Sequence, residues 1–185
     1  SGQLVPICTY VVMAISLSLT VGFLGELSLG HAGFMSVGAF SGVIAAACLK
    51  GSIPSHGLLL LISIIIGGIF AGIAGLLIGI PVLRLRGDYL AIVTLAFGEI
   101  IKNIINCVYA GVDSKGLHFS MVNVDALGME NGKLILNGPQ GAVGITKLSS
   151  FGAGVILILF ALFIVLNLVN SKTGRAVTAI RDNRI

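Results

Sequence analysis

The chain has 185 residues, of which 56% are hydrophobic and only 10% are charged. A soluble domain carries about 25% charged residues, so this composition excludes a soluble globular domain and a disordered tail. The net charge of +4 at pH 7 is spread over the edges of apolar stretches and forms no single basic face, which also argues against a nucleic-acid-binding protein.

Five apolar stretches make up most of the chain, and Glu99 and Lys102 are the only Asp, Glu, Lys or Arg residues inside them. An apolar helix of about 20 residues crosses the roughly 30 Å hydrocarbon core of a bilayer. We therefore predict an all-α, polytopic transmembrane helix bundle. The five predicted spans are Leu4–Gly25, Ala32–Leu49, Leu58–Pro81, Tyr89–Tyr109 and Phe151–Asn170.

The positive charges predict how these spans are oriented. The connection 82–88 and the segment 171–185 are rich in Lys and Arg, whereas 50–57 carries one lysine and 110–148 has balanced charge. Because Lys and Arg accumulate in cytoplasmic loops, we expect 82–88 and 171–185 in the cytoplasm and the other two segments outside. The spans then alternate without adjustment, and the N-terminus lies outside.

A short segment, residues 26–31, separates the first two predicted spans and is too weakly polar for an ordinary surface loop. It contains Glu26, Ser28, Gly30 and His31. Irregular backbone at membrane depth survives only where protein buries it or where it lines a wet cavity, and such breaks mark binding sites in transporters. We interpret the segment as a broken or re-entrant element at a translocation path, with a plain cytoplasmic turn as the alternative. For His31, we favour a structural role over a proton relay.

Glycines at helical spacing predict where helices pack closely, because small residues let two backbones approach in lipid. One stripe lies in the third span, and a further pair lies in the second. These residues are Gly68, Gly72, Gly75 and Gly79, and then Gly38 and Gly42. The cysteines Cys8, Cys48 and Cys107 show no C-x-x-C spacing, so we interpret them as small buried hydrophobic residues and not as disulfide or metal-binding residues.

Glu99 and Lys102 stand three residues apart in the fourth span, so they lie on the same side of a helix and can pair. Ionisable groups inside a span usually face the bundle interior or a water-filled path. The two residues are therefore candidates for a pathway or gating pair. A structural ion pair, with Lys102 reaching toward the membrane interface, is an equal alternative.

The loop 110–148 is polar and contains Asn131-Gly132 next to the short apolar run 133–136. Asn-Gly beside such a run is a hairpin signal, so we predict a small external β-hairpin, either as a cap over the external mouth or as a decorated loop. The segment 171–185 predicts a basic amphipathic helix that binds anionic lipid or docks on a cytoplasmic partner.

The sequence contains no H-E-x-x-H, G-x-S-x-G or G-x-x-x-x-G-K-[ST] motif and no cluster of metal-ligating residues. We therefore expect no enzyme activity, no metal and no cofactor in this chain. If ATP powers the protein, another polypeptide must bind it. An ion-coupled secondary transporter would need coupling-ion residues in its spans, and Glu99 is the one candidate.

Four motifs, in order along the chain, resemble those of the LivM-type permeases of branched-chain amino-acid ABC transporters. They are Ser28–Gly33 with Gly38–Phe40, Gly79–Lys102, Asn137–Gly141 with Gly144–Ile145, and Gly174–Ala176 with Ala179–Asn183. The pattern of that family continues past Ile185. The resemblance therefore implies that 1–185 is a partial, truncated permease domain, with an external loop at 110–148 and a cytoplasmic coupling segment at 171–185.

The resemblance further implies a multi-pass subunit of an ATP-driven importer in the bacterial cytoplasmic membrane. Such a subunit moves Leu, Ile or Val that an extracellular solute-binding protein delivers, and it pairs in the lipid bilayer with a second related permease subunit and two ATP-binding subunits, which bind the ATP. Urea, short amides or other amino acids are alternative substrates within the family. The residues implied in ATPase coupling are Gly174, Arg175, Ala179, Ile180 and Arg181.

Overall fold

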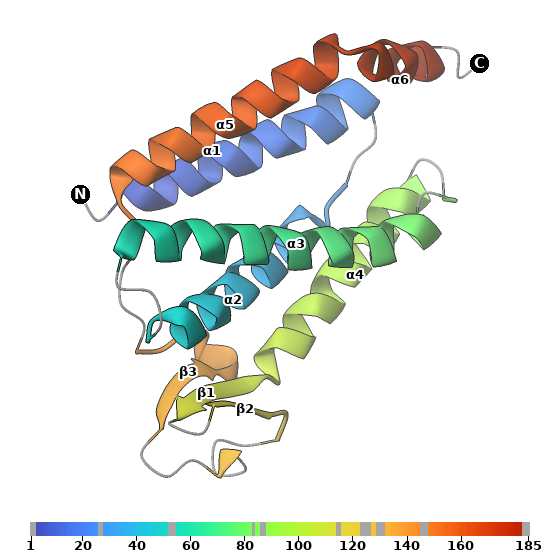
Figure 1. Ribbon diagram of the computed structural model, residues 1–185. Coiled ribbons are helices and arrows are strands. Elements are labelled where there is room, and N and C mark those ends of the chain that lie inside the picture. Colours follow the sequence, from blue (N-terminus) through green and yellow to red (C-terminus); the bar gives the residue numbers. More distant parts are fainter. Residues whose placement is uncertain are drawn as a thin grey trace.

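The computed structural model describes residues 3–25, 28–51, 55–82, 84–85, 88–113, 116–122, 127–128, 132–144 and 148–182. Figure 1 shows long helices with a small sheet at one end. The helices are α1 (Leu4–Ser18), which continues as the π-helix η1 (Leu19–Leu24), α2 (His31–Leu49), α3 (His56–Val82), α4 (Asp88–Asn106), α5 (Phe151–Asn170) and α6 (Lys172–Asp182). The remaining elements are β1 (Tyr109–Asp113), β2 (Gly116–Ser120), β3 (Lys133–Asn137) and the 3-10 turn η3 (Gly138–Gln140).

Five helices among the described residues are long and apolar enough to cross a membrane, and this confirms the predicted helical bundle. The spans are Leu4–Gly22, His31–Leu49, His56–Val82, Tyr89–Asn106 and Phe151–Asn170. At most 11% of the most apolar window of any span is buried inside the chain. Most of the apolar surface therefore faces lipid or another polypeptide, as expected when lipid replaces water as the solvent around a helix.

The helices run in the relative directions that the alternation of charged loops predicts. α2 and α4 run parallel, with Gly33 of α2 against Gly98 of α4, and α3 runs antiparallel to α2, with Ser63 against Gly42. α1 and α5 run side by side in the same direction as α3 (Figure 1). Every span can therefore cross the bilayer in its predicted sense.

The closest helix contact joins α2 to α3 through glycines. A Cβ added at Gly67 would lie 2.5 Å from the carbonyl oxygen of Gly38, and one added at Gly42 would lie 3.2 Å from that of Ser63. The predicted stripe on α3 does not take part, because within the described chain a Cβ at any of its glycines meets nothing within 4 Å. Those glycines are Gly68, Gly72, Gly75 and Gly79. No described residue of the chain packs against these glycines, so their role in helix packing stays a prediction, now for contact with another polypeptide.

The described part of the loop between α4 and α5 folds as a three-stranded antiparallel sheet in the order β2-β1-β3. A hairpin is present, but it joins β1 to β2, with Asp113 paired to Gly116. β3 forms at the predicted apolar run and pairs with β1, because its apolar side chains are buried there against Ala110. Asn131, the start of the predicted turn, lies outside the described residues.

The small core of the sheet fastens it to the last turns of α2. Ala110, Ile135 and Leu136 are almost fully buried. α2 packs against them with four apolar side chains, those of Phe40, Val43, Ile44 and Ala47. The sheet therefore sits at the end of α2 and α4 that the charge pattern assigns to the outside of the cell.

The cysteine prediction is only partly right. Cys8 is buried, and its side chain lies against Gly154 of α5. Cys48 and Cys107 are free and exposed, because they lie at the ends of α2 and α4, where no other helix of the described chain covers them.

The orientation can be tested by cysteine labelling in intact cells. Lys133 on β3 and Lys172 on α6 are both exposed, so either Lys→Cys variant will react if the reagent reaches it. After Cys48 and Cys107 are replaced by Ser, we expect a membrane-impermeant maleimide to label the Lys133→Cys variant and not the Lys172→Cys variant. Permeabilised cells should label both. Labelling of Lys172→Cys in sealed cells would reverse the orientation.

Candidate functional site

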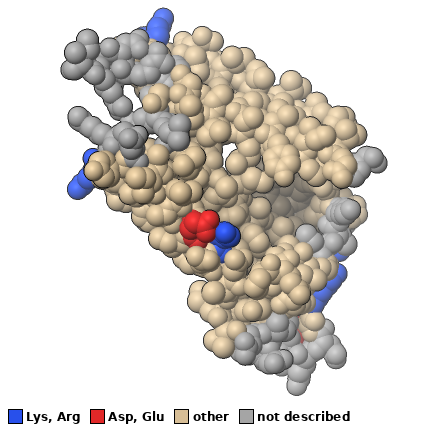
Figure 2. All heavy atoms as spheres, turned by 180° about the vertical axis from the view of Figure 1, so that it is seen from behind, with Lys and Arg blue, Asp and Glu red and all other residues tan. Residues whose placement is uncertain are grey.

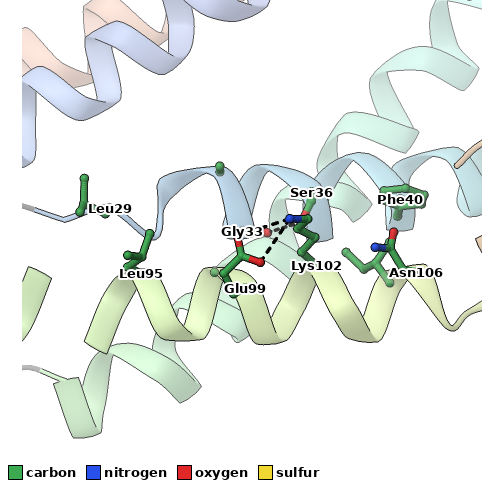
Figure 3. Close-up of a pocket in the computed structure, with 11 residues that line it drawn as sticks. Leu29, Gly33, Ser36, Phe40, Leu95, Glu99, Lys102 and Asn106 are labelled. Atoms are coloured by element: carbon green, nitrogen blue, oxygen red, sulfur yellow. Dashed lines mark hydrogen bonds and ion pairs between the residues drawn. The ribbon is translucent and has the colours of Figure 1, made fainter. Parts of the chain in front are cut away.

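A groove of about 300 Å³ lies between the parallel helices α2 and α4. Figure 3 shows that residues of both helices line it, with Ser36, Glu99 and Lys102 near its middle, Leu29 and Leu95 toward one end, and Phe40 beside Asn106 toward the other. The lining residues include Leu29, Ser36, Phe40, Glu99, Lys102 and Asn106. Two of the predicted site residues, Glu99 and Lys102, thus meet in one groove.

Glycines bring the two walls of the groove close together. A Cβ added at Gly33 would lie 3.1 Å from the Cα of Gly98 and 3.2 Å from the Cδ1 of Ile101. A Cβ at Gly30 would lie 2.9 Å from the carbonyl oxygen of Thr94. The floor of the groove is therefore formed largely by the backbones of α2 and α4 at these glycines. Side chains of neighbouring turns form its two walls.

Glu99 and Lys102 form an ion pair inside the groove. Lys102 Nζ donates to Glu99 Oε2 at 3.2 Å and to Oε1 at 3.4 Å. The Lys102 side chain is 63% exposed and the Glu99 side chain is 58% exposed. Glu99 lies about 16 Å along the axis of α4 from Asp88, so the pair stands inside the span. Figure 2 shows one adjoining acidic and basic pair on a surface otherwise largely free of charge. An ion pair at this depth is costly unless it faces a wet path or a polar partner.

The break before α2 packs against α4, about 9 Å along its axis from Asp88. The backbone N–H of Leu29 donates to Thr94 Oγ1 at 3.2 Å, and this hydroxyl itself donates to the carbonyl of Ala91 at 2.9 Å. A buried hydroxyl on another helix thus satisfies irregular backbone at membrane depth. This contact favours the broken-element interpretation of 26–31 over a plain surface turn. Thr94 was not among the predicted site residues. In the sequence, only its hydroxyl group within an apolar span could have marked it as a candidate.

The other predicted residues of the break lie elsewhere. His31, the first residue of α2, points to α1, where its Nε2 lies 3.2 Å from Ser16 Oγ. Its Nδ1 is buried without a hydrogen-bond partner among the described residues. His31 therefore links two helices, which favours its structural interpretation. Ser28 is half-buried, and Glu26 lies outside the described residues.

The end of the groove next to the sheet is held by the turn that follows β3. Gly138 has φ 45°, and its backbone N–H donates to the carbonyl of Val108 at 3.2 Å. A Cβ at this position would lie 2.7 Å from the carbonyl oxygen of Asn106, which is a groove residue. Only glycine tolerates both the conformation and the contact. The turn therefore ties the sheet to the last residue of α4, beside the groove.

α5 is capped by Ser171, whose backbone is extended, and α6 follows directly after this bend, here called the elbow. α6 also contacts η1. Ser171 closes the elbow, since its Oγ donates to the Leu168 carbonyl at 2.6 Å and accepts from the Gly174 N–H at 3.1 Å. Gly174 is buried there, and a Cβ would collide with the carbonyls of Leu168 and Val169. The predicted amphipathic helix is thus present. Among the residues implied in coupling, Arg175 and Ala179 are exposed, and the side chains of Ile180 and Arg181 lie outside the described residues.

A family model described as the permease component of the branched-chain amino acid transport system matches residues 2–185. The chain belongs to this permease family. Over 93 residues it is 45% identical to the high-affinity branched-chain amino acid transport system permease protein LivM of Escherichia coli (strain K12). It is 43% identical to the protein of the same name from Salmonella typhimurium (strain LT2). Each match covers 50% of this chain and 20% of the relative. No solved structure matches the chain significantly.

In this permease, three of the four motifs that carry the resemblance fall on the groove or at one of its ends. Residues 28–33 form the break and the start of α2, and 79–102 include the wall of α4 that carries the ion pair. Residues 137–141 hold the end of the groove next to the sheet, whereas 174–176 lie apart from the groove, in the elbow between α5 and α6. The groove is therefore the candidate functional site of this multi-pass membrane protein, and the elbow is a second candidate region.

Proposed function

We propose that this chain is a membrane-spanning subunit of an ATP-driven importer that moves Leu, Ile or Val across the bacterial cytoplasmic membrane. The observation that carries the proposal is a groove with an ion pair inside a span, in a member of the branched-chain amino-acid permease family. The similarity to LivM over half of the chain supports the same substrates.

The partners follow from the same proposal. An extracellular solute-binding protein delivers the amino acid, a second related permease subunit completes the path, and two ATP-binding subunits hydrolyse ATP. The exposed apolar faces of the spans support assembly with another membrane subunit. At most 11% of the most apolar window of any span is buried inside the described chain. The exposed side chains of Arg175 and Ala179 on α6 leave a surface for a cytoplasmic partner.

An ion-coupled secondary transporter is less well supported by the site. Such a protein needs an intramembrane acid that can exchange its proton or bind a cation. Glu99 is the acidic candidate, and it already pairs with Lys102. A coupling cation would therefore have to displace Lys102 Nζ from this carboxylate. The pair therefore suits an ATP-driven importer better than ion coupling.

Transport by the reconstituted complex tests the proposal. With the full-length permease, its partner subunits and leucine-loaded binding protein in proteoliposomes, we expect leucine uptake that requires ATP on the side of the ATP-binding subunits. A proton or sodium gradient without ATP should give no uptake. Uptake driven by either gradient alone would refute the proposed mechanism, and ATP-driven uptake of urea but not leucine would refute the proposed substrate.

A further inference from the structure

We propose that the Glu99–Lys102 pair and the groove around it form a transient subsite for the zwitterion of an aliphatic α-amino acid. The pair opens, Glu99 takes the α-ammonium group and Lys102 takes the α-carboxylate. This inference rests on the proposed function and adds the residues that handle the substrate within the membrane.

The charges of the pair match those of an α-amino acid. Lys102 Nζ and Glu99 Oε2 are 3.2 Å apart, and an α-amino acid carries its ammonium and carboxylate on one carbon atom. When the amino acid binds, the Glu99–Lys102 pair is replaced by two ion pairs, one between Glu99 and the substrate ammonium and one between Lys102 and the substrate carboxylate. Each of them is a charge-assisted hydrogen bond. The groove and its occupant are each neutral overall, so no uncompensated charge enters the membrane at any stage. Neither urea nor a short amide offers this exchange, because both are uncharged.

The charged atoms of the pair are accessible to a substrate. Both side chains come from the same helix, three residues apart; they line the groove, and each is more than half exposed. Because unpaired charge is costly at this depth, the pair opens only as the substrate replaces each partner. A pair that held two helices together would resist opening, whereas this one spans a single turn of α4. Opening it therefore leaves the contact between α2 and α4, which rests on Gly33 and Gly98, unchanged.

The groove accommodates the aliphatic part of such a substrate. Apolar side chains flank the pair on both sides, Leu29 and Leu95 toward the break and Phe40 toward the sheet (Figure 3). The volume of about 300 Å³ is at the small end of ligand pockets, which suits one amino acid and not a peptide. Ser36 stands on the α2 wall among these groups, and its hydroxyl is already donated to the Gly33 carbonyl at 2.6 Å.

Cysteine protection tests the subsite without depending on the selectivity of a binding protein. In the purified complex with full-length permease and no other reactive cysteine, we expect leucine to slow thiol labelling of a Ser36→Cys variant severalfold. Leucinol carries only the ammonium and 4-methylpentanoate only the carboxylate, so each should protect less. Ser41→Cys on the same helix, outside the groove lining, is the control, and leucine should leave its labelling rate unchanged. Equal protection by all three compounds, or by none, would overturn the subsite.

Neutral substitutions separate a subsite from a structural ion pair. Lys102→Met leaves Glu99 unpaired and should impair assembly, whereas the double variant Glu99→Gln/Lys102→Met should assemble normally, because no charge is left unpaired. We expect leucine uptake by this double variant to stay at least about tenfold below wild type, since two charge-assisted contacts with the substrate are lost. A structural pair predicts instead that the double variant regains uptake together with assembly, and that result would overturn the inference.

The two experiments also distinguish this inference from the proposed function. A wild-type complex that imports no branched-chain amino acid refutes the proposed function. A wild-type complex that imports leucine, with normal uptake by the double variant and no protection of Ser36→Cys, refutes the subsite alone.

Discussion

Replacing Gly67 with alanine is expected to push α2 away from α3 and lower the melting temperature of the permease, whereas the same change at Gly68 is expected to leave it equal or higher. Both residues lie in α3, so alanine gains up to about 1 kcal/mol of helix propensity at either position. Only at Gly67 does the new Cβ meet another helix, 2.5 Å from the Gly38 carbonyl oxygen and 3.6 Å from the Cα of Gly42. Overpacking of this kind costs about 1–3 kcal/mol, which exceeds the gain in propensity.

The measurement is thermal unfolding of the two purified variants, side by side with wild type, in one detergent. Equal melting temperatures for Gly67→Ala and Gly68→Ala would show that α2 and α3 do not approach as closely as described. A larger substitution at the same glycine, Gly68→Leu, tests the exposed stripe in the assembled complex. If Gly68→Leu is neutral in the separate permease but prevents assembly, a partner polypeptide covers the stripe.

The sequence predicted the five spans well because the property that defines them is local. Length and apolarity suffice to identify a membrane helix, and the predicted boundaries differ from the observed helices by only a few residues; the third span, for example, was predicted as Leu58–Pro81 and is His56–Val82. The pair at Glu99 and Lys102 was equally local, since a spacing of three residues in a helix places two side chains together. Both predictions need only the geometry of one helix.

Features that depend on two distant segments were harder to predict. Periodicity showed that four glycines share a face of α3, but it could not show which face meets α2, and Gly67, next to the stripe, is the residue in contact. The Asn-Gly signal pointed to a hairpin, but β3 pairs with β1 instead, since burial of Ala110, Ile135 and Leu136 decides the pairing. The role of Thr94 toward Leu29 joins residues 65 positions apart, and no local pattern encodes such a contact.

Replacing Gly174 with alanine is expected to abolish the stimulation of ATP hydrolysis by loaded binding protein in the assembled complex. The elbow between α5 and α6 has no room for a Cβ at this position, because the carbonyl oxygens of Leu168 and Val169 occupy the space. The backbone must therefore move, and the hydrogen bond from the Gly174 N–H to Ser171 Oγ is strained or lost. α6 would then leave its position against η1 and present its exposed face at a different angle to the ATP-binding subunit.

Two further variants identify the cause of any loss. Gly152→Ala is the matched control, since it lies in the first turn of α5, where a Cβ meets nothing within 4 Å, and it should retain full stimulation. Ala179→Glu keeps the elbow but places a carboxylate on the exposed face of α6, and it should also abolish stimulation if that face docks in a protein groove. Arg181→Glu should act in the same way.

The measurement is ATP hydrolysis by purified complex with and without loaded binding protein, together with a check that the ATP-binding subunits still copurify. Loss of stimulation in Gly174→Ala and Ala179→Glu but not in Gly152→Ala would mean that both the angle and the surface of α6 matter for coupling. Loss of stimulation in Gly174→Ala alone would mean that coupling depends on the geometry of the elbow and that the exposed face of α6 makes no contact needed for coupling. Because the apolar face of α6 is small and lipid binding scales with buried apolar area and charge, normal stimulation in all the variants would make α6 a segment at the lipid surface with no part in coupling.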